Sequence, residues 1–185
     1  QVANGARSAI MAADLTSAGI PGPQDSLDGP FGYLRLFEEQ ADLTPVAATV
    51  GTIWRIAEVS HKPFPTGRAA HGGIVLLQKL LEQGLDIAGL ESLTLTAPPL
   101  IHRLVGRPIT PDMSVSYARL CFQYVGAVTL SNGTIGLGDY TGTALADPQI
   151  HALGKKITVV DDGSLDPAAF APQFARAQMA DGRVI

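Results

Sequence analysis

The chain has 185 residues, of which 46% are hydrophobic and 16% are charged, enough for one or at most two compact units with a real core. The formal net charge is -4 and no basic stripe stands out, which argues against nucleic acid and anionic membrane surfaces as partners. Cys121 is the single cysteine, so no internal disulfide forms, and a core position in a reducing compartment is expected. Because no apolar run could span a bilayer and no signal-peptide pattern opens the chain, a cytoplasmic location is expected.

The first predicted element is a helix that ends near residue 18. Its apolar stripe has no N-cap residue ahead of it and consists of Val2, Ala6, Ile10 and Ala13. We therefore expect this helix to be cut out of something longer. Gly19 is a plausible residue just past the helix end, and Pro21 cannot continue the helix. A loop over 22–30 and a short aromatic helix over 31–37 follow.

After a small-residue connection over 41–51, the pattern changes to strands and helices. Residues 53–59 alternate like a β-strand. A helix is predicted over 68–83, because one buried face collects Ala70, Ile74, Leu77 and Leu81. Residues 93–97 alternate again and predict a second strand, which Pro98 and Pro99 terminate.

The strongest helix signals lie at Thr110 and Pro111, a natural N-cap followed by proline at the first helical position. They predict a helix over 112–130 that stops at Asn132-Gly133. Its buried stripe is Met113, Tyr117, Leu120 and Tyr124. Arg119 falls beside this stripe, so we expect it at the helix flank with a structural partner.

The last part of the chain predicts one short helix and two strands. Asp147-Pro148 repeats the cap-and-proline signal for a helix closed by Gly154, and strands follow around 157–160 and 174–180. No regular βαβ rhythm and no glycine-rich fingerprint are present, so residues 52–185 are predicted to form an α+β layer, a small sheet covered by two long helices. Leu77, Leu81, Leu120 and Tyr124 should lie between the layers.

The most informative stretch is 61–73, because it gathers His61, Lys62, Arg68 and His71 around a turn that opens onto a helix. Pro63 and Pro65 hold the preceding residues extended, and Gly67 is expected to take a backbone turn that other residues resist. The free N–H groups of the helix start would then lie near Lys62 and Arg68, and this arrangement predicts an anion site suited to a carboxylate.

Several separate motifs resemble those of one family, the MmgE/PrpD family. They occur in the family's order over nearly the whole chain: Asn4-Gly5-Ala6-Arg7-Ser8-Ala9, Gly19 with Gly22-Pro23, Leu27-Asp28-Gly29-Pro30-Phe31-Gly32, Lys62-Pro63-Phe64-Pro65 with His71, and Ala118-Arg119-Leu120-Cys121-Phe122-Gln123-Tyr124 with Ala127 and Gly133. Members of the family include 2-methylcitrate dehydratase, cis-aconitate decarboxylase and iminodisuccinate epimerase.

The resemblance implies a domain organisation. Family members have a large all-helical domain built from both ends of the chain, with an α+β lid domain inserted between. Residues 1–40 would be the C-terminal piece of the first part of that helical domain, and residues 52–185 the complete lid. The resemblance further implies that an aspartate and histidines of the active site lie in the helical domain of the same polypeptide, upstream of Gln1. The 185-residue chain alone is therefore expected to be inactive, and the full-length protein is expected to be a homodimer.

The resemblance also implies the chemistry, which is dehydration, decarboxylation or epimerisation of a small di- or tricarboxylate. Such reactions need cations that hold carboxylates and an acid/base pair that moves a proton. We assign Lys62 and His71 as catalytic residues and Arg68, Thr66 and Arg107 as substrate-binding residues. The sequence has no metal-ligand cluster, in agreement with the cofactor-independent chemistry that the resemblance implies. A 2-methylcitrate dehydratase-like reaction is the leading expectation, although Thr66-Gly67-Arg68 departs from the stretch found in better-known dehydratases and decarboxylases.

Each assignment has a structural alternative. A lysine before proline is often a solvated turn residue, a helix histidine is often packed, and Arg68 could pair with Glu82 at the surface. Arg107 belongs to a basic cluster with His102 and Arg103, which is either a solvated loop or a lid edge facing the cleft. At the level of function, the alternatives are an epimerase or decarboxylase of the same family, or a catalytically silent carboxylate-binding module.

Overall fold

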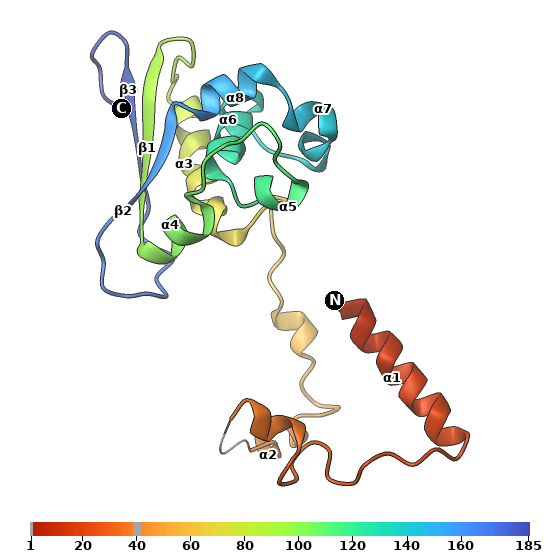
Figure 1. Ribbon diagram of the computed structural model, residues 1–185. Helices are drawn as coiled ribbons and strands as arrows, with labels where there is room; N and C mark the ends of the chain where they lie inside the picture. Colours follow the sequence, from red (N-terminus) through yellow and green to blue (C-terminus); the bar gives the residue numbers. More distant parts are fainter. Residues whose placement is uncertain (1, 39–41) are drawn as a thin grey trace. The chain divides into compact units, whose positions relative to one another are not determined.

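The computed structural model describes residues 2–38 and 42–185, drawn as a ribbon in Figure 1. The chain divides into two compact units, Gln1–Val59 and Ser60–Ile185. Among the described residues, every buried hydrophobic side chain belongs to the second unit, from Ala69 to Met179. The hydrophobic core, and with it most of the packing that can position a site, therefore lies after residue 60.

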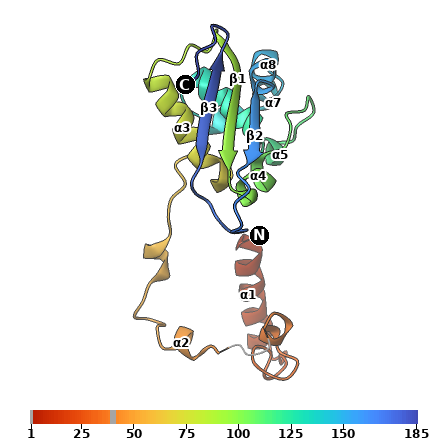
Figure 2. The same ribbon diagram turned by 90° about the vertical axis from the view of Figure 1, so that its left-hand side faces the viewer.

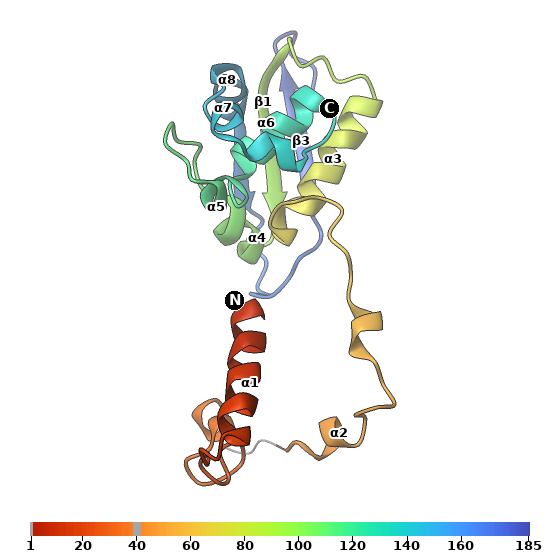
Figure 3. The same ribbon diagram turned by 90° about the vertical axis from the view of Figure 1, so that its right-hand side faces the viewer.

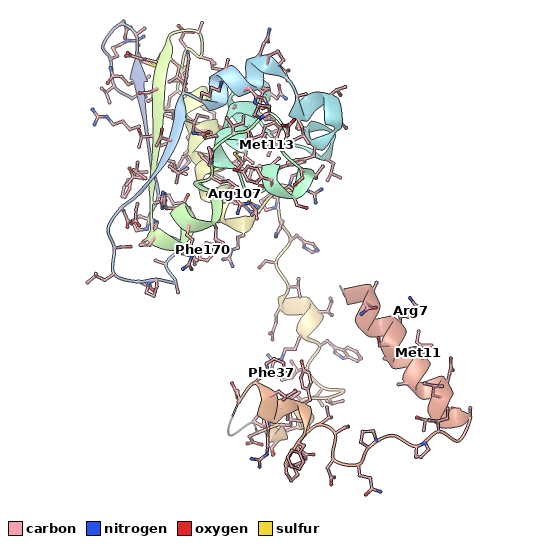
Figure 4. All side chains as sticks on the ribbon, viewed as in Figure 1. Arg7, Met11, Phe37, Arg107, Met113 and Phe170 are labelled. Atoms are coloured by element: carbon pink, nitrogen blue, oxygen red, sulfur yellow. The ribbon has the colours of Figure 1, made fainter. Side chains whose placement is uncertain are left out.

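The first unit contains helix α1 (Val2–Ser17), the 3-10 helix η1 (Tyr33–Leu36), helix α2 (Thr44–Ala47) and the 3-10 helix η2 (Arg55–Glu58). Gly19 has a φ of 90°, which confirms the predicted end of α1. Large apolar side chains of this unit are exposed: Ile10 is 65% exposed and Phe37, labelled in Figure 4, is 70% exposed. The side chain of Val2 and the segment 39–41 lie outside the described part.

The predicted strand over 53–59 is wrong, because this segment forms the 3-10 helix η2. Within it Arg55 pairs with Glu58 at 3.0 Å, and the Ala57 amide donates to the Trp54 carbonyl. A strand needs a hydrogen-bonded neighbour, and all three strands of the sheet lie later in the chain, from Leu90 onward. Local turn bonds satisfy the backbone instead, so alternation of side chains alone did not decide the structure.

The second unit is built on a three-stranded sheet in the order β2-β1-β3. Strand β1 (Leu90–Ala97) pairs in parallel with β2 (Ile157–Asp161) and antiparallel with β3 (Phe174–Met179). Leu93 lies opposite Ile157 on one side and Ala177 on the other, and all three are fully buried. This register places one row of apolar side chains on the same face of the sheet.

The helices cover that buried face. Figures 2 and 3 view the sheet from opposite sides, and helices α3 (His71–Glu82) and α6 (Phe122–Asn132) stand behind the strands in one view and before them in the other. Leu77 of α3 and Tyr124 of α6 are fully buried, whereas Leu81 and Leu120 are half-buried. The predicted α+β class, a small sheet covered by two helices, is confirmed.

The helix predicted over 112–130 is interrupted. Helix α5 (Val115–Ala118) begins at Ser114, whose Oγ accepts from the Tyr117 amide at 3.2 Å, and α6 begins only at Phe122. Between them Cys121 is extended and pairs with Gly106 in an isolated antiparallel bridge. Thr110-Pro111 leads only into a turn, and the bridge at Cys121 separates α5 from α6, so that Arg119 and Leu120 lie in a turn.

The remaining elements are short helices. Helix α8 (Pro148–Gly154) is capped as predicted, since the Asp147 carboxylate accepts from the Gln149 amide at 2.8 Å. Three further elements were not predicted, because none spans enough residues to show a helical period. They are α4 (Pro99–Val105), the 3-10 helix η4 (Leu137–Tyr140) and α7 (Gly142–Leu145). None of the helices in the described part has the length and apolarity needed to cross a bilayer.

Candidate functional site

The loop before α3, residues 61–67, carries the first site residue. The Lys62 side chain is exposed, and its Nζ donates to the backbone carbonyl of Thr66 at 3.4 Å. Thr66 is 4% exposed and is one of two buried polar residues of the chain's described part, the other being Thr129. The two prolines keep this loop extended, so Lys62 lies outside the following helix as the sequence predicts.

This loop, which we call the lysine loop, is tied to the turn between α5 and α6. The Thr66 hydroxyl donates to the Arg119 carbonyl at 2.5 Å, and the Gly67 amide donates to the same carbonyl at 3.0 Å. The predicted special turn at Gly67 is wrong, since its φ of -61° and ψ of 136° are open to any residue. A Cβ at Gly67 would lie 2.4 Å from Cδ2 of Leu120, so a larger residue there would push the Leu120 side chain aside.

The two tied segments share a pocket of about 440 Å³, here called the lysine–arginine pocket. Its lining residues include Lys62 and Thr66 from the lysine loop, Ser116 from α5, Arg119 and Leu120 from the turn, and Leu137 from η4. Two cations contribute to this wall, and none of its lining residues is acidic. A concave surface with two positive charges and partly apolar sides is suited to a small anion such as a carboxylate.

Arg119 is the residue of this pocket that sequence reasoning did not assign to the site. Its guanidinium carbon lies 5.2 Å from the ring centroid of Tyr140, so Tyr140 is the structural partner that was expected. Tyr140 is 6% exposed, and its hydroxyl is buried without a hydrogen-bond partner among the described residues. Burial raises the pKa of Tyr140, while the nearby Thr66 hydroxyl and the Arg119 charge oppose that rise. The sequence feature that could have pointed to Arg119 is its place as the basic residue of the family motif at 118–124.

His71 does not line the lysine–arginine pocket. It lies in a second cavity of about 390 Å³, lined also by Phe64, Val75, Phe170 and Gln173. Its ring meets Phe64 edge-on at 5.4 Å, and its Nε2 is buried with no hydrogen-bond partner in the described part. Burial lowers the pKa of His71, and the charges of Lys62 and Arg68 act in the same direction against an opposing contribution from the Thr66 backbone.

Arg68 and Arg107, both predicted to bind substrate, each lie against an aromatic ring. The Arg68 guanidinium carbon is 5.2 Å from the ring centroid of Phe170, which Figure 4 labels on the connection from β2 to β3. It forms no salt bridge with Glu82. Arg107, labelled in the same figure, lies 5.0 Å from the Tyr117 ring centroid and lines neither of the two cavities. The structure therefore brings Lys62 and Thr66 together with Arg119, and it places His71, Arg68 and Arg107 elsewhere.

Cys121 is also accounted for by packing. It is fully buried, its Sγ donates to the Arg107 carbonyl at 3.3 Å, and burial raises its thiol pKa. Within the ranges 2–38 and 42–185, no group of three or more His, Cys, Asp or Glu side chains is placed to hold a metal ion.

A comparison with known protein families matches most of the second unit to one family. The model of the MmgE/PrpD C-terminal domain matches residues 64–185, which is more than half of the chain and includes His71, Arg119 and Tyr140. A search among curated proteins found no match. The family match agrees with the resemblance carried by the motifs around Lys62 and Arg119, and on this basis the chain belongs to the MmgE/PrpD family.

Proposed function

We propose that this chain supplies the carboxylate-binding part of a cofactor-independent lyase or isomerase that acts on a small di- or tricarboxylic acid. The family is one of dehydratase- and lyase-type enzymes. The single observation that carries the proposal is that Lys62 and Arg119 line one pocket with no acidic residue among its lining side chains. Because no carboxylate among the lining residues neutralises them, both charges are available for a substrate.

The two cations suit different tasks in such a site. A guanidinium can bind a carboxylate through two parallel hydrogen bonds, while an ammonium acts as a compact point charge. The apolar side chains of Leu120 and Leu137 in the wall exclude some water and strengthen these interactions. When a proton leaves the carbon next to a carboxylate, negative charge develops on the carboxylate oxygens, and nearby cations stabilise that charge.

Dehydration of a hydroxy acid is the reaction we propose first. A base removes the proton from the carbon next to a carboxylate, a carbon–carbon double bond forms, and the hydroxyl on the neighbouring carbon leaves as water after an acid protonates it. In this proposal Lys62 stabilises the carboxylate during this step, and its position in the pocket wall supports that role. His71 opens onto the second cavity and not onto this pocket, so we propose it for proton transfer only with a substrate that reaches both; burial favours its neutral imidazole, which can accept a proton. The remaining acid/base groups would come from a helical domain of the same polypeptide.

The test uses the full-length polypeptide that contains this chain. Incubation with a panel of citrate-like acids should give ultraviolet absorbance from an unsaturated product, whereas an epimerase would convert substrate without that absorbance. Lys62→Ala should lower kcat/KM by at least about a hundredfold, the order of effect of removing one stabiliser of developing charge. Lys79→Ala, which removes an exposed lysine of α3, is the matched control and should leave kcat/KM unchanged. Near-normal turnover of Lys62→Ala with an unchanged melting temperature would reject the proposal.

The same assay applied to the 185-residue chain alone should detect no turnover, because the proposed reaction needs groups from both domains. His71→Ala in the full-length protein tests whether His71 transfers a proton or orients the substrate. A loss comparable to that of Lys62→Ala is expected if His71 moves the proton, and a smaller loss if it only orients the substrate.

A further inference from the structure

The backbone of Arg119 is held firmly, but its side chain has few anchors. Thr66 and Gly67 both donate to the Arg119 carbonyl. The guanidinium, in contrast, forms no hydrogen bond or salt bridge with any residue of the described part. Among the described residues, the one aromatic ring it meets is that of Tyr140, with 5.2 Å between the guanidinium carbon and the ring centroid. A long side chain that must be immobilised on binding costs affinity, so whatever restrains this guanidinium beforehand contributes to ligand binding.

Tyr140 is a rigid platform for that contact. Its ring is 6% exposed and lies 6.1 Å from the ring of Tyr124, measured between centroids. The preceding residue fastens the segment, because the Asp139 carboxylate accepts from the Gly136 amide at 2.7 Å and from Asn132 Nδ2 at 3.3 Å. The Tyr124 hydroxyl donates to the Asp139 carbonyl. Tyr124 and Asn132 of helix α6 therefore both anchor Asp139, the residue before Tyr140.

The hydroxyl and the ring of Tyr140 have separable roles. The hydroxyl is buried with no hydrogen-bond partner in the described part, and the nearby Thr66 hydroxyl donates its hydrogen bond to the Arg119 carbonyl. The face of the ring, which is electron-rich, is what meets the guanidinium.

We propose that Tyr140 is a positioning residue of the lysine–arginine pocket, whose ring holds the Arg119 guanidinium ready for a substrate carboxylate. This inference rests on the proposed function, since it assumes that the pocket binds a carboxylate. Tyr140 does not line the pocket itself and acts through Arg119. Loss of the ring should weaken carboxylate binding, whereas loss of the hydroxyl should not.

The experiment measures the Kd of the full-length protein for citrate, used as a tricarboxylate probe, by titration calorimetry. Tyr140→Phe should bind citrate within about twofold of the unchanged protein, while Tyr140→Leu should raise Kd by about threefold to thirtyfold, the range that cation–π energies convert to. A ring-fluorinated phenylalanine at position 140 keeps the shape but withdraws charge from the ring face, and it should also raise Kd. This variant decides the question if Tyr140→Leu does not fold.

A double-mutant cycle separates positioning from general structural damage. If Tyr140 acts through Arg119, then Tyr140→Leu should cause no further loss of citrate binding once Arg119→Gln is present. An equal loss in both backgrounds would overturn the inference, as would a loss in Tyr140→Phe matching that in Tyr140→Leu.

Failure of the inference is distinguishable from failure of the proposed function. Weakened citrate binding in Lys62→Ala and Arg119→Gln, together with unchanged binding in Tyr140→Leu and in the fluorinated variant, would overturn the role of Tyr140 alone. Unchanged binding in Lys62→Ala and Arg119→Gln would reject the carboxylate pocket, and with it the role of Tyr140.

Discussion

The hydroxyl of Thr66 donates a hydrogen bond of 2.5 Å to the backbone carbonyl of Arg119, 53 residues further along the chain. The Gly67 amide donates to the same oxygen at 3.0 Å, so that two donors from the lysine loop share one acceptor. These bonds bring Lys62 and Arg119 to one pocket. Thr66 was expected to bind substrate, but its hydroxyl already donates a hydrogen bond to the Arg119 carbonyl. We propose that it positions the two cations instead.

Replacing Thr66 should show this role. Thr66→Val keeps the shape of the side chain but removes the donor, and the Arg119 carbonyl then keeps only the Gly67 amide. We expect the free energy of unfolding to fall by about 1–2 kcal/mol, because a buried hydrogen bond is lost. Thr66→Ser retains the hydroxyl and should recover most of that loss. The measurement is urea denaturation of the full-length protein, and equal stability of the valine and serine variants would contradict the prediction.

Acid should destabilise the protein partly through His71. Burial lowers the pKa of His71 below its ordinary value of 6.5. As the pH falls through this value the unfolded chain takes up a proton before the folded protein does, so stability contributed by His71 is present at neutral pH and is lost on acidification. His71→Gln should therefore show a smaller decrease in the free energy of unfolding between about pH 7 and pH 5.

The matched control for that measurement is His102→Gln. His102 is an exposed histidine of α4 and should leave the acid sensitivity unchanged. If His71→Gln loses stability on acidification as steeply as His102→Gln does, His71 is not the group responsible.

Gly73 should tolerate no side chain, although it lies inside helix α3. A Cβ there would come 2.4 Å from the ring of Phe122, which is fully buried, and 3.0 Å from Leu95. Alanine gains up to about 1 kcal/mol of helix propensity, but overpacking a core costs about 1–3 kcal/mol, so the net effect of Gly73→Ala should be destabilising. Gly142→Ala, at a helical position with nothing within 4 Å, should be neutral or slightly stabilising. Thermal unfolding of both variants compares the two, and similar melting temperatures would refute the packing argument.

Cys121 should be chemically inert in the folded protein. It is fully buried and its thiol pKa is raised by burial, so little thiolate is present or reachable at neutral pH. Iodoacetamide labelling followed by mass spectrometry should modify Cys121 only after denaturant is added. Rapid labelling of the native protein would mean that the turn between α5 and α6 opens readily.

Local signals in the sequence were sufficient to predict helix ends, where a capping side chain or a glycine with positive φ decides the structure. Asp147 caps α8, Gly133 ends α6 with a φ of 77°, and Gly19 ends α1. Alternation was sufficient for β1, because β2 and β3 lie on either side of it. The same alternation at 53–59 misled, since no strand pairs with that segment and the 3-10 helix η2 forms.

The sequence by itself determined the family, the α+β class and the place of Lys62 outside the following helix, because these depend on residue order and on local backbone preferences. Only the tertiary structure decided that Arg119 joins Lys62 and that His71 does not. Pairing of Cys121 with Gly106 breaks the predicted helix, and Thr66 then captures the Arg119 carbonyl in the resulting turn. Both contacts join residues far apart in the chain, and no local propensity encodes which distant backbone group a buried donor will find.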